Sequence, residues 1–168
     1  VSAIILAGGK GKRMGKDISK QFILVKDKPI IYYTIKKFSD CKLIDEIILV
    51  LPKDEIEYCK KEVLEKYSLK VDKIIAGGKE RQDSVYNGLK ALKNSDIVLI
   101  HDGARPFVSE KIILDGIENA KKYGAAAPGV MPKDTIKVKD DFSFSKETLK
   151  RESLIAIQTP QVFKKDII

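Results

Sequence analysis

Short apolar runs alternate with amphipathic segments along most of the chain, and this alternation predicts strands connected by helices. The apolar runs are rich in β-branched residues, which favour strands, and they cover residues 3–7, 46–51, 71–76, 96–101 and 125–130. Helical spacing covers residues 29–38, 53–66, 80–92 and 109–122. A repeating strand–helix order predicts an α/β fold: a Rossmann-like, mostly parallel sheet with helices on both faces.

The pattern changes after Pro132. Residues 135–139 alternate between apolar and polar side chains as a strand does, and the aspartates at 140–141 are typical of a turn. Residues 142–144 are then expected to pair back on the first strand. We therefore expect a β-hairpin at about residues 132–154.

The remaining segments complete a single domain over residues 1–168. Residues 22–25 are expected to be a short extended piece. Residues 154–157 are predicted to return as a strand, which the sequence QTPQ at 158–161 interrupts. A helix is expected to begin at Phe163.

A segment that combines glycines with cations follows the first predicted strand and reads GGKGKRMGK over residues 8–16. Glycine allows sharp turns and close approach of backbone N–H groups, and such groups with basic side chains bind anions, polyphosphate above all. The P-loop pattern does not fit, because Asp17 follows Lys16 where Ser or Thr is needed. The dinucleotide fingerprint does not fit either, because three residues separate Gly11 from Gly15.

Three loops with candidate chemistry follow predicted strands, at residues 8–20, 77–84 and 102–107. Ligands of open parallel sheets bind beyond the carboxyl ends of the strands. We therefore expect these loops to converge on one site at that edge.

The net charge of +8 indicates anionic partners. The lysines are spread along the chain without a basic block, which favours small phosphorylated substrates over nucleic acid. No apolar run is long enough to span a membrane, and the first run lacks the features of a signal peptide. Cys41 and Cys59 match no metal or redox spacing. We expect a cytoplasmic protein with reduced thiols and without nucleic-acid or membrane partners. No residue is assigned as a metal ligand, and whether the protein contacts a metal directly stays open.

Several motifs occur in a characteristic order: LAGGKGKRMG at 6–15 with KQF at 20–22, GGKERQDSVYNGL at 77–89, HDGARPFV at 101–108, PKDTIK at 132–137 and RESLIAIQTPQVF at 151–163. Together they resemble the 2-C-methyl-D-erythritol 4-phosphate cytidylyltransferases of the non-mevalonate isoprenoid pathway. These enzymes belong with the sugar-nucleotide pyrophosphorylases among the nucleotidyltransferases. The resemblance spans nearly the whole chain.

The resemblance implies that CTP and 2-C-methyl-D-erythritol 4-phosphate react to give 4-diphosphocytidyl-2-C-methyl-D-erythritol and pyrophosphate. The attacking oxygen belongs to a phosphate monoester, whose second pKa is about 6, so no catalytic base or covalent nucleophile is needed. The reaction instead needs fixed cations and N–H donors that neutralise growing negative charge, and in-line positioning. The expected cofactor is Mg²⁺, held mainly by the CTP phosphates.

The resemblance also assigns the nucleotide site. Arg13 and Lys20 are the implied catalytic pair at the triphosphate. Backbone contacts to the nucleotide are implied for Ala7, Gly8 and Gly9, and Gly78 and Ser84 are implied to read the cytosine. Gly103 completes the nucleotide-binding set and stands where many relatives have Ala. Ser84 has a simpler explanation as a helix N-terminal cap.

Asp102 and Arg105 are implied to hold the acceptor. The resemblance also implies that the hairpin at about residues 132–154 is a protruding β-arm through which the family forms homodimers, with an ordinary surface hairpin as the alternative. Thr135 and Arg151 are implied to reach the acceptor phosphate from the arm of the partner subunit. Arg81 is expected either to support the site or to pair with a carboxylate. His101 is given no role.

Two departures keep alternatives open. The LAGG form is frequent in ribitol-5-phosphate cytidylyltransferases, whereas the ARP sequence at 104–106 and Arg151-x-x-Leu154 fit the erythritol enzymes better. Family members continue for several dozen residues, so we expect the family's C-terminal helix and a further lysine near the triphosphate to be missing after Ile168. A nucleotide-binding module without catalysis is therefore the alternative from another class.

Overall fold

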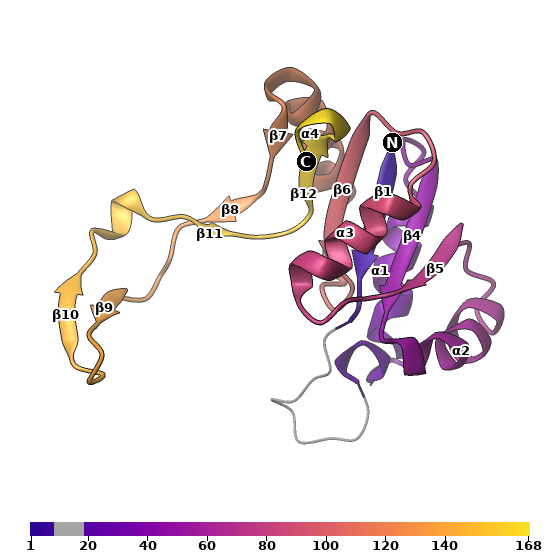
Figure 1. Cartoon of the computed structure of the whole chain (residues 1–168), viewed down its shortest axis with the longest axis horizontal. Helices are drawn as coiled ribbons and strands as arrows, with labels where there is room; N and C mark the ends of the chain where they lie inside the picture. The colour runs from indigo at the N-terminus through magenta and orange to yellow at the C-terminus, as the bar shows by residue number, and fades with distance from the viewer. Residues whose placement is uncertain (9–18) are drawn as a thin grey trace.

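The computed structural model describes residues 1–8 and 19–168. A twisted sheet lies between helices, and a hairpin extends away from this body (Figure 1). The sheet contains β1 (Ser2–Leu6), β4 (Glu46–Leu51), β5 (Lys73–Ala76), β6 (Ile97–Asp102), β7 (Ala125–Ala126) and β12 (Gln161–Lys164). Its strand order is β5-β4-β1-β6-β12-β7, in which the first four strands run parallel and β12 is antiparallel to both neighbours. The predicted mostly parallel α/β fold is confirmed.

Helices cover both faces of the sheet, as the sequence predicts. On β1, Ala3 and Ile5 pack into the larger core cluster, to which α1 (Ile30–Ser39), α2 (Ile56–Cys59) and α4 (Glu110–Tyr123) contribute. Ile4 and Leu6 point to the opposite face, where they pack with α3 (Arg81–Ala91). Every residue of β1 is buried, which is the pattern expected of a central parallel strand.

The close packing of α3 on β1 depends on Gly88. A Cβ atom at this position would lie 2.7 Å from Cγ2 of Ile4, which is too close for a real contact. The missing side chain lets the helix lie directly on the strand. The N-terminal end of α3 is thereby brought to the carboxyl edge of the sheet, where the predicted loops converge.

The ends of α4 have clear local causes. Ser109 caps the helix by accepting a hydrogen bond from the N–H of Ile112 at 3.3 Å. Gly124 ends it with a positive φ of 94°, and its N–H donates to the carbonyl of Ala120 at 2.8 Å.

The predicted helix at 53–66 is divided into three pieces. A 3-10 turn, η2 (Lys53–Glu55), precedes α2, and a π-helical stretch, η3 (Lys60–Glu65), follows it. In the part of the chain that the structure describes, no helix combines the length and the apolar character needed to cross a membrane.

The hairpin consists of β9 (Lys137–Lys139) and β10 (Ser145–Thr148), which pair antiparallel. At its base, β8 (Gly129–Val130) pairs with β11 (Ala156–Ile157), and a 3-10 turn, η4 (Arg151–Ser153), precedes β11. The hairpin projects far from the main sheet (Figure 1). The expected pairing of residues 142–144 is only partly right: the Asp140 N–H donates to the carbonyl of Phe144 at 2.9 Å, but the strand that pairs back is β10. The Asp140 carboxylate accepts the N–H groups of Phe142 and Phe144 and holds them in the turn.

Three further expectations differ from the structure. Phe22 lies in a 3-10 turn, η1 (Lys20–Phe22), and only β2 (Leu24–Val25) is extended, paired with β3 (Lys28–Pro29). The run at 125–130 is split into β7 and β8. Phe163 does not begin a helix but lies in β12, because Val162 and Phe163 pack on opposite faces of the sheet. Only a short 3-10 turn, η5 (Lys165–Ile167), follows.

Candidate active site

A cavity of about 340 Å³ lies at the carboxyl edge of the sheet, where β1 and β6 end side by side. Backbone hydrogen bonds extend the ladder past the strand ends: Ala7 N–H donates to Val50 O at 2.8 Å, and Gly103 N–H donates to Leu6 O at 2.7 Å. The loops that leave these strands therefore start from fixed positions. The cavity is lined by Leu6, Ala7, Gly8, Lys20, Gln21, Gly78, Lys79, Glu80, Arg81, Ser84, Asp102 and Ala104.

One wall of the cavity is the tight turn before α3. The buried hydroxyl of Ser84 accepts from the N–H of Gly78 at 3.1 Å and donates to the carbonyl of Glu80 at 3.3 Å. A Cβ atom on Gly78 would lie only 2.1 Å from Cβ of Asp83, so this turn requires glycine. The cap of α3 is Glu80, which forms a capping box with Asp83, so the simpler explanation of Ser84 as the helix cap is wrong.

The Asp102 carboxylate is held between two guanidinium groups. Nη2 of Arg81 lies 3.3 Å from Oδ1, and Nε of Arg105 lies 3.1 Å from Oδ2. Nη2 of Arg81 also donates to Oε1 of Gln161 at 3.3 Å, and Nη1 of Arg105 donates to Oε1 of Gln158. This network joins α3, the loop after β6 and the segment at the base of the hairpin. Arg81 is expected from the sequence either to support the site or to pair with a carboxylate, and it does both: it lines the cavity and pairs with Asp102.

Two buried side chains hold the loop that carries Arg105 through hydrogen bonds to its carbonyl groups. The Thr34 hydroxyl donates to the carbonyl of Gly103 at 2.8 Å. Nε2 of His101 lies 3.0 Å from the carbonyl of Arg105, and because a carbonyl only accepts, Nε2 carries the hydrogen. Burial is the main cause that lowers the pKa of His101, whose ring packs on Phe38 with the centroids 5.0 Å apart. His101 therefore supports the loop, a role that the sequence analysis did not assign.

The structure brings together only part of the sequence-predicted set. Gly103 is buried directly behind the cavity, and Arg105 reaches it through Asp102. Thr135 and Arg151 are exposed on the hairpin and do not line the cavity. Gly9 and Arg13 lie outside the described residues. The cavity gathers the others: Ala7, Gly8, Lys20, Gly78, Ser84 and Asp102.

Within residues 1–8 and 19–168, no three or more His, Cys, Asp or Glu side chains are grouped to hold an ion. Asp102 nevertheless places a carboxylate in the cavity beside Arg81. Mg²⁺ is commonly held by one or two carboxylates together with substrate phosphates, and this arrangement fits that mode.

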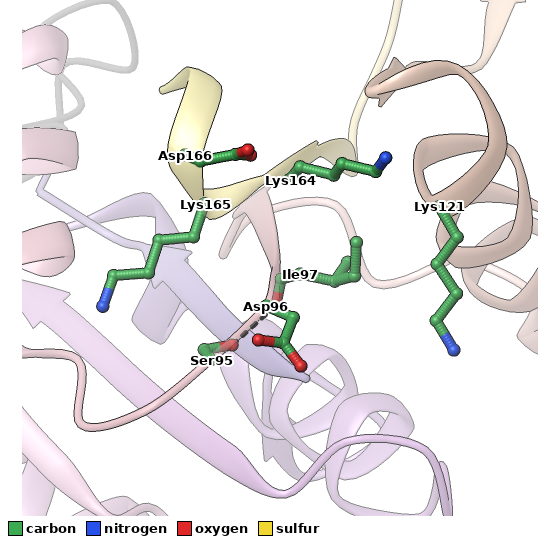
Figure 2. Close-up of a pocket in the computed structure, with 7 residues that line it drawn as sticks. All are labelled: Ser95, Asp96, Ile97, Lys121, Lys164, Lys165 and Asp166. Atoms are coloured by element: carbon green, nitrogen blue, oxygen red, sulfur yellow. Dashed lines mark hydrogen bonds between the residues drawn. The ribbon is translucent and has the colours of Figure 1, made fainter.

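A larger hollow of about 680 Å³ lies at the opposite edge of the sheet, where β6 begins and β12 ends. Figure 2 shows that the amino groups of Lys121, Lys164 and Lys165 point in different directions there. The hydrogen bond drawn in it joins the Ser95 hydroxyl to the carbonyl of Ile97 at 2.8 Å. Because the cations do not converge on a common point, we assign the site to the cavity at the carboxyl edge.

Comparisons with known proteins identify the family of this chain. A family model described as IspD, 2-C-methyl-D-erythritol 4-phosphate cytidylyltransferase, matches residues 1–168. A protein of that name from Clostridium botulinum (strain Eklund 17B / Type B) is 66% identical over 168 residues, which are 100% of this chain and 75% of that protein.

Solved structures are similar over the whole fold. The 4-diphosphocytidyl-2C-methyl-D-erythritol synthase of Anaerococcus prevotii DSM 20548 superposes with a TM-score of 0.83 at 38% identity, covering 99% of this chain and 71% of that one. The bifunctional IspDF of Campylobacter jejuni gives a TM-score of 0.80 at 30% identity, covering 98% and 41%. The chain belongs to the 2-C-methyl-D-erythritol 4-phosphate cytidylyltransferase family.

Proposed function

We propose that this chain transfers the cytidylyl group of CTP to 2-C-methyl-D-erythritol 4-phosphate, which yields 4-diphosphocytidyl-2-C-methyl-D-erythritol and pyrophosphate for isoprenoid biosynthesis. Family membership over residues 1–168 supports the reaction. The observation that carries the proposal for the site is the cavity itself. It gathers, from two loops far apart in the sequence, the described residues expected to contact the nucleotide, except Gly103, which is buried and does not line it.

In this proposal the cytosine lies against Gly78 and Ser84, and the phosphates extend toward Gly8 and Lys20. Gly78 and Ser84 both line the cavity, and the Ser84 hydroxyl oxygen has two lone pairs, of which the Gly78 N–H uses one, which supports its contact with a base edge. The exposed ammonium of Lys20 neutralises charge on the α-phosphate and on the leaving pyrophosphate, a contribution of about 3 kcal/mol by analogy with oxyanion-hole donors. We assign Arg13 the same task from its sequence motif alone.

Asp102 and Arg105 are proposed to bind the acceptor. Asp102 is also the residue we propose as the protein ligand of Mg²⁺, whose remaining ligands come from the CTP phosphates and water. Bound there, the ion adds positive charge where the phosphates accumulate negative charge. The two oxygens of this carboxylate pair with Arg81 and Arg105 in the structure, so Mg²⁺ would have to replace at least one of these ion pairs.

We further propose a homodimer in which the hairpin of one copy reaches the cavity of the other. Thr135 and Arg151 lie outside the cavity of their own chain, and the hairpin extends away from it (Figure 1). Phe142 and Phe144, 82% and 71% exposed, provide apolar area that a second copy can cover. A cytoplasmic location stays part of the proposal and is supported by the free, buried Cys41 and Cys59.

Pyrophosphate release tests the proposal directly. Release from CTP should require both 2-C-methyl-D-erythritol 4-phosphate and Mg²⁺, should stop when EDTA is added, and should be abolished by Lys20→Ala. Near-full turnover of that variant would remove Lys20 from the mechanism. Faster turnover with ribitol 5-phosphate would favour the alternative acceptor, which the LAGG sequence at 6–9 supports. Binding of CTP without any product from either acceptor would instead indicate a non-catalytic module.

A further inference from the structure

Lys20 is flanked on both sides by residues that donate to the same carboxylate. The Ser19 hydroxyl donates to Oε1 of Glu55, and Nε2 of Gln21 donates to Oε2 of Glu55 at 2.7 Å. We propose that Gln21 and Glu55 are positioning residues that set where the Lys20 ammonium lies, an inference that rests on the proposed function. Neither residue belongs to the site set expected from the sequence motifs.

Gln21 connects this anchor, the hydrogen bonds of Ser19 and Gln21 to Glu55, to the central sheet. Its side-chain amide is almost fully buried, with 2% of the residue exposed, and Nε2 donates a second hydrogen bond to the carbonyl of Ala7 at 2.8 Å. Ala7 is itself fixed, because its N–H donates to Val50 O beyond the ends of β1 and β4. Both hydrogens of this amide are therefore used, and they tie the backbone directly after Lys20 to the edge of the sheet.

Glu55 has a defined position of its own. It lies in η2 directly after β4, and its N–H donates to the carbonyl of Pro52 at 3.0 Å. The following turns add a second support, since the ring of Phe22 packs edge-on against Tyr58 with the centroids 4.9 Å apart. The end of β4 thus determines the position of the carboxylate, and the carboxylate determines the position of η1.

The side chain of Lys20 needs such support because it is exposed. A lysine side chain has four rotatable bonds and a single point charge, so packing does not fix its ammonium once it is in solvent. The direction in which it leaves the backbone is then the main constraint on where it points. A displacement of about 1 Å at a reacting centre can cost about a hundredfold in rate, which makes the anchor relevant to catalysis.

The test is a double-mutant cycle read out as the dissociation constant of CTP with Mg²⁺, measured by calorimetry on the full chain. Glu55→Ala should weaken CTP binding about tenfold in the wild-type background. In a Lys20→Ala background the same change should have less than a twofold effect, because the residue that it positions is gone. Glu57→Ala is the matched control, since Glu57 is an exposed acid of the same region that pairs with Lys60. This control should bind CTP as the wild type does.

Equal weakening by Glu55→Ala in both backgrounds would overturn the proposal, because it would show a general structural role. No weakening in either background would also overturn it. Glu55→Gln preserves the size of the side chain and one acceptor oxygen, so it serves as the test if Glu55→Ala fails to fold. It should weaken CTP binding less than Glu55→Ala does, and again only when Lys20 is present. Turnover of the wild type distinguishes failure of this inference from failure of the proposed function. If the wild type is active and Glu55→Gln binds CTP as well as the wild type does, only the positioning role of Gln21 and Glu55 is refuted. A wild type that neither binds CTP nor releases pyrophosphate refutes the proposed function, and the anchor proposal with it.

Discussion

Gly78→Ala is the sharpest single perturbation of the proposed base site. The new Cβ atom would lie 2.1 Å from Cβ of Asp83 and 3.2 Å from its backbone carbon. Neither atom can rotate away, because both are fixed by the first turn of α3. Ordinary contact begins at 3.4 Å, so the turn at 77–80 has to move by about 1.3 Å in a closely packed region.

Such a movement removes the hydrogen bond from the N–H of Gly78 to Ser84, which is already 3.1 Å long. Overpacking costs about 1–3 kcal/mol and a lost hydrogen bond about 0.5–1.5 kcal/mol. We expect the free energy of unfolding to fall by about 2–4 kcal/mol, which an average domain survives. The cost to function should be larger: about a hundredfold or more in kcat/KM, because the wall of the base site is displaced by more than 1 Å.

Urea unfolding gives the stability change, and pyrophosphate release gives kcat/KM. Gly103→Ala is the graded control, because its Cβ would lie 3.0 Å from Cβ of Ala7 and needs a shift of only a few tenths of an ångström. That variant should keep kcat/KM within about threefold of wild type. The reasoning is refuted if Gly78→Ala is folded and retains wild-type kcat/KM, or if both variants lose activity equally.

Three further predictions concern the rest of the site. Burial lowers the pKa of His101 below its ordinary value of 6.5, so the unfolded chain takes up a proton that the folded chain resists. The free energy of unfolding, measured with urea, should therefore fall as the pH drops below about 6.5. In His101→Gln this fall should be smaller, and an equal fall would show that buried His101 does not cause the pH dependence. Asp102→Asn should change Tm little, because each of its half-exposed ion pairs contributes about 1 kcal/mol or less. The same variant should lower kcat/KM at least about tenfold, and unchanged turnover would remove Asp102 from the site. Lys20→Ala and Arg151→Ala are each expected to be inactive alone and to recover activity when mixed, because a mixed dimer contains one intact shared site; no recovery at any ratio would argue against a shared site.

The positions of the central strands in the sequence could be predicted, because these strands are buried on both faces and therefore read as continuous apolar runs. β12 could not be predicted in the same way. It is a four-residue strand that pairs with β6 and β7, and its sequence QVFK has no periodicity that separates a strand from a helix. The tertiary contacts of Val162 and Phe163 decide its structure.

The cavity could be predicted for a related reason: the glycine-rich turns directly follow buried strands, and parallel strands end at one edge. The supporting contacts could not. Gln21 and Glu55 are 34 positions apart in the sequence, and Thr34 reaches Gly103 across 69 positions, so nothing in the local pattern connects them. The resemblance of the motifs implies which residues face the nucleotide, whereas the residues that hold them in place become visible only once the elements are packed together.

A crystal structure of the chain soaked with CTP and Mg²⁺ tests the central claim most directly. We predict that the cytosine lies against Gly78 and Ser84, with the triphosphate beside Gly8 and the Lys20 ammonium. Nucleotide bound in the hollow between Lys121 and Lys164 at the other edge of the sheet, or a cavity left empty at saturating CTP, would contradict it.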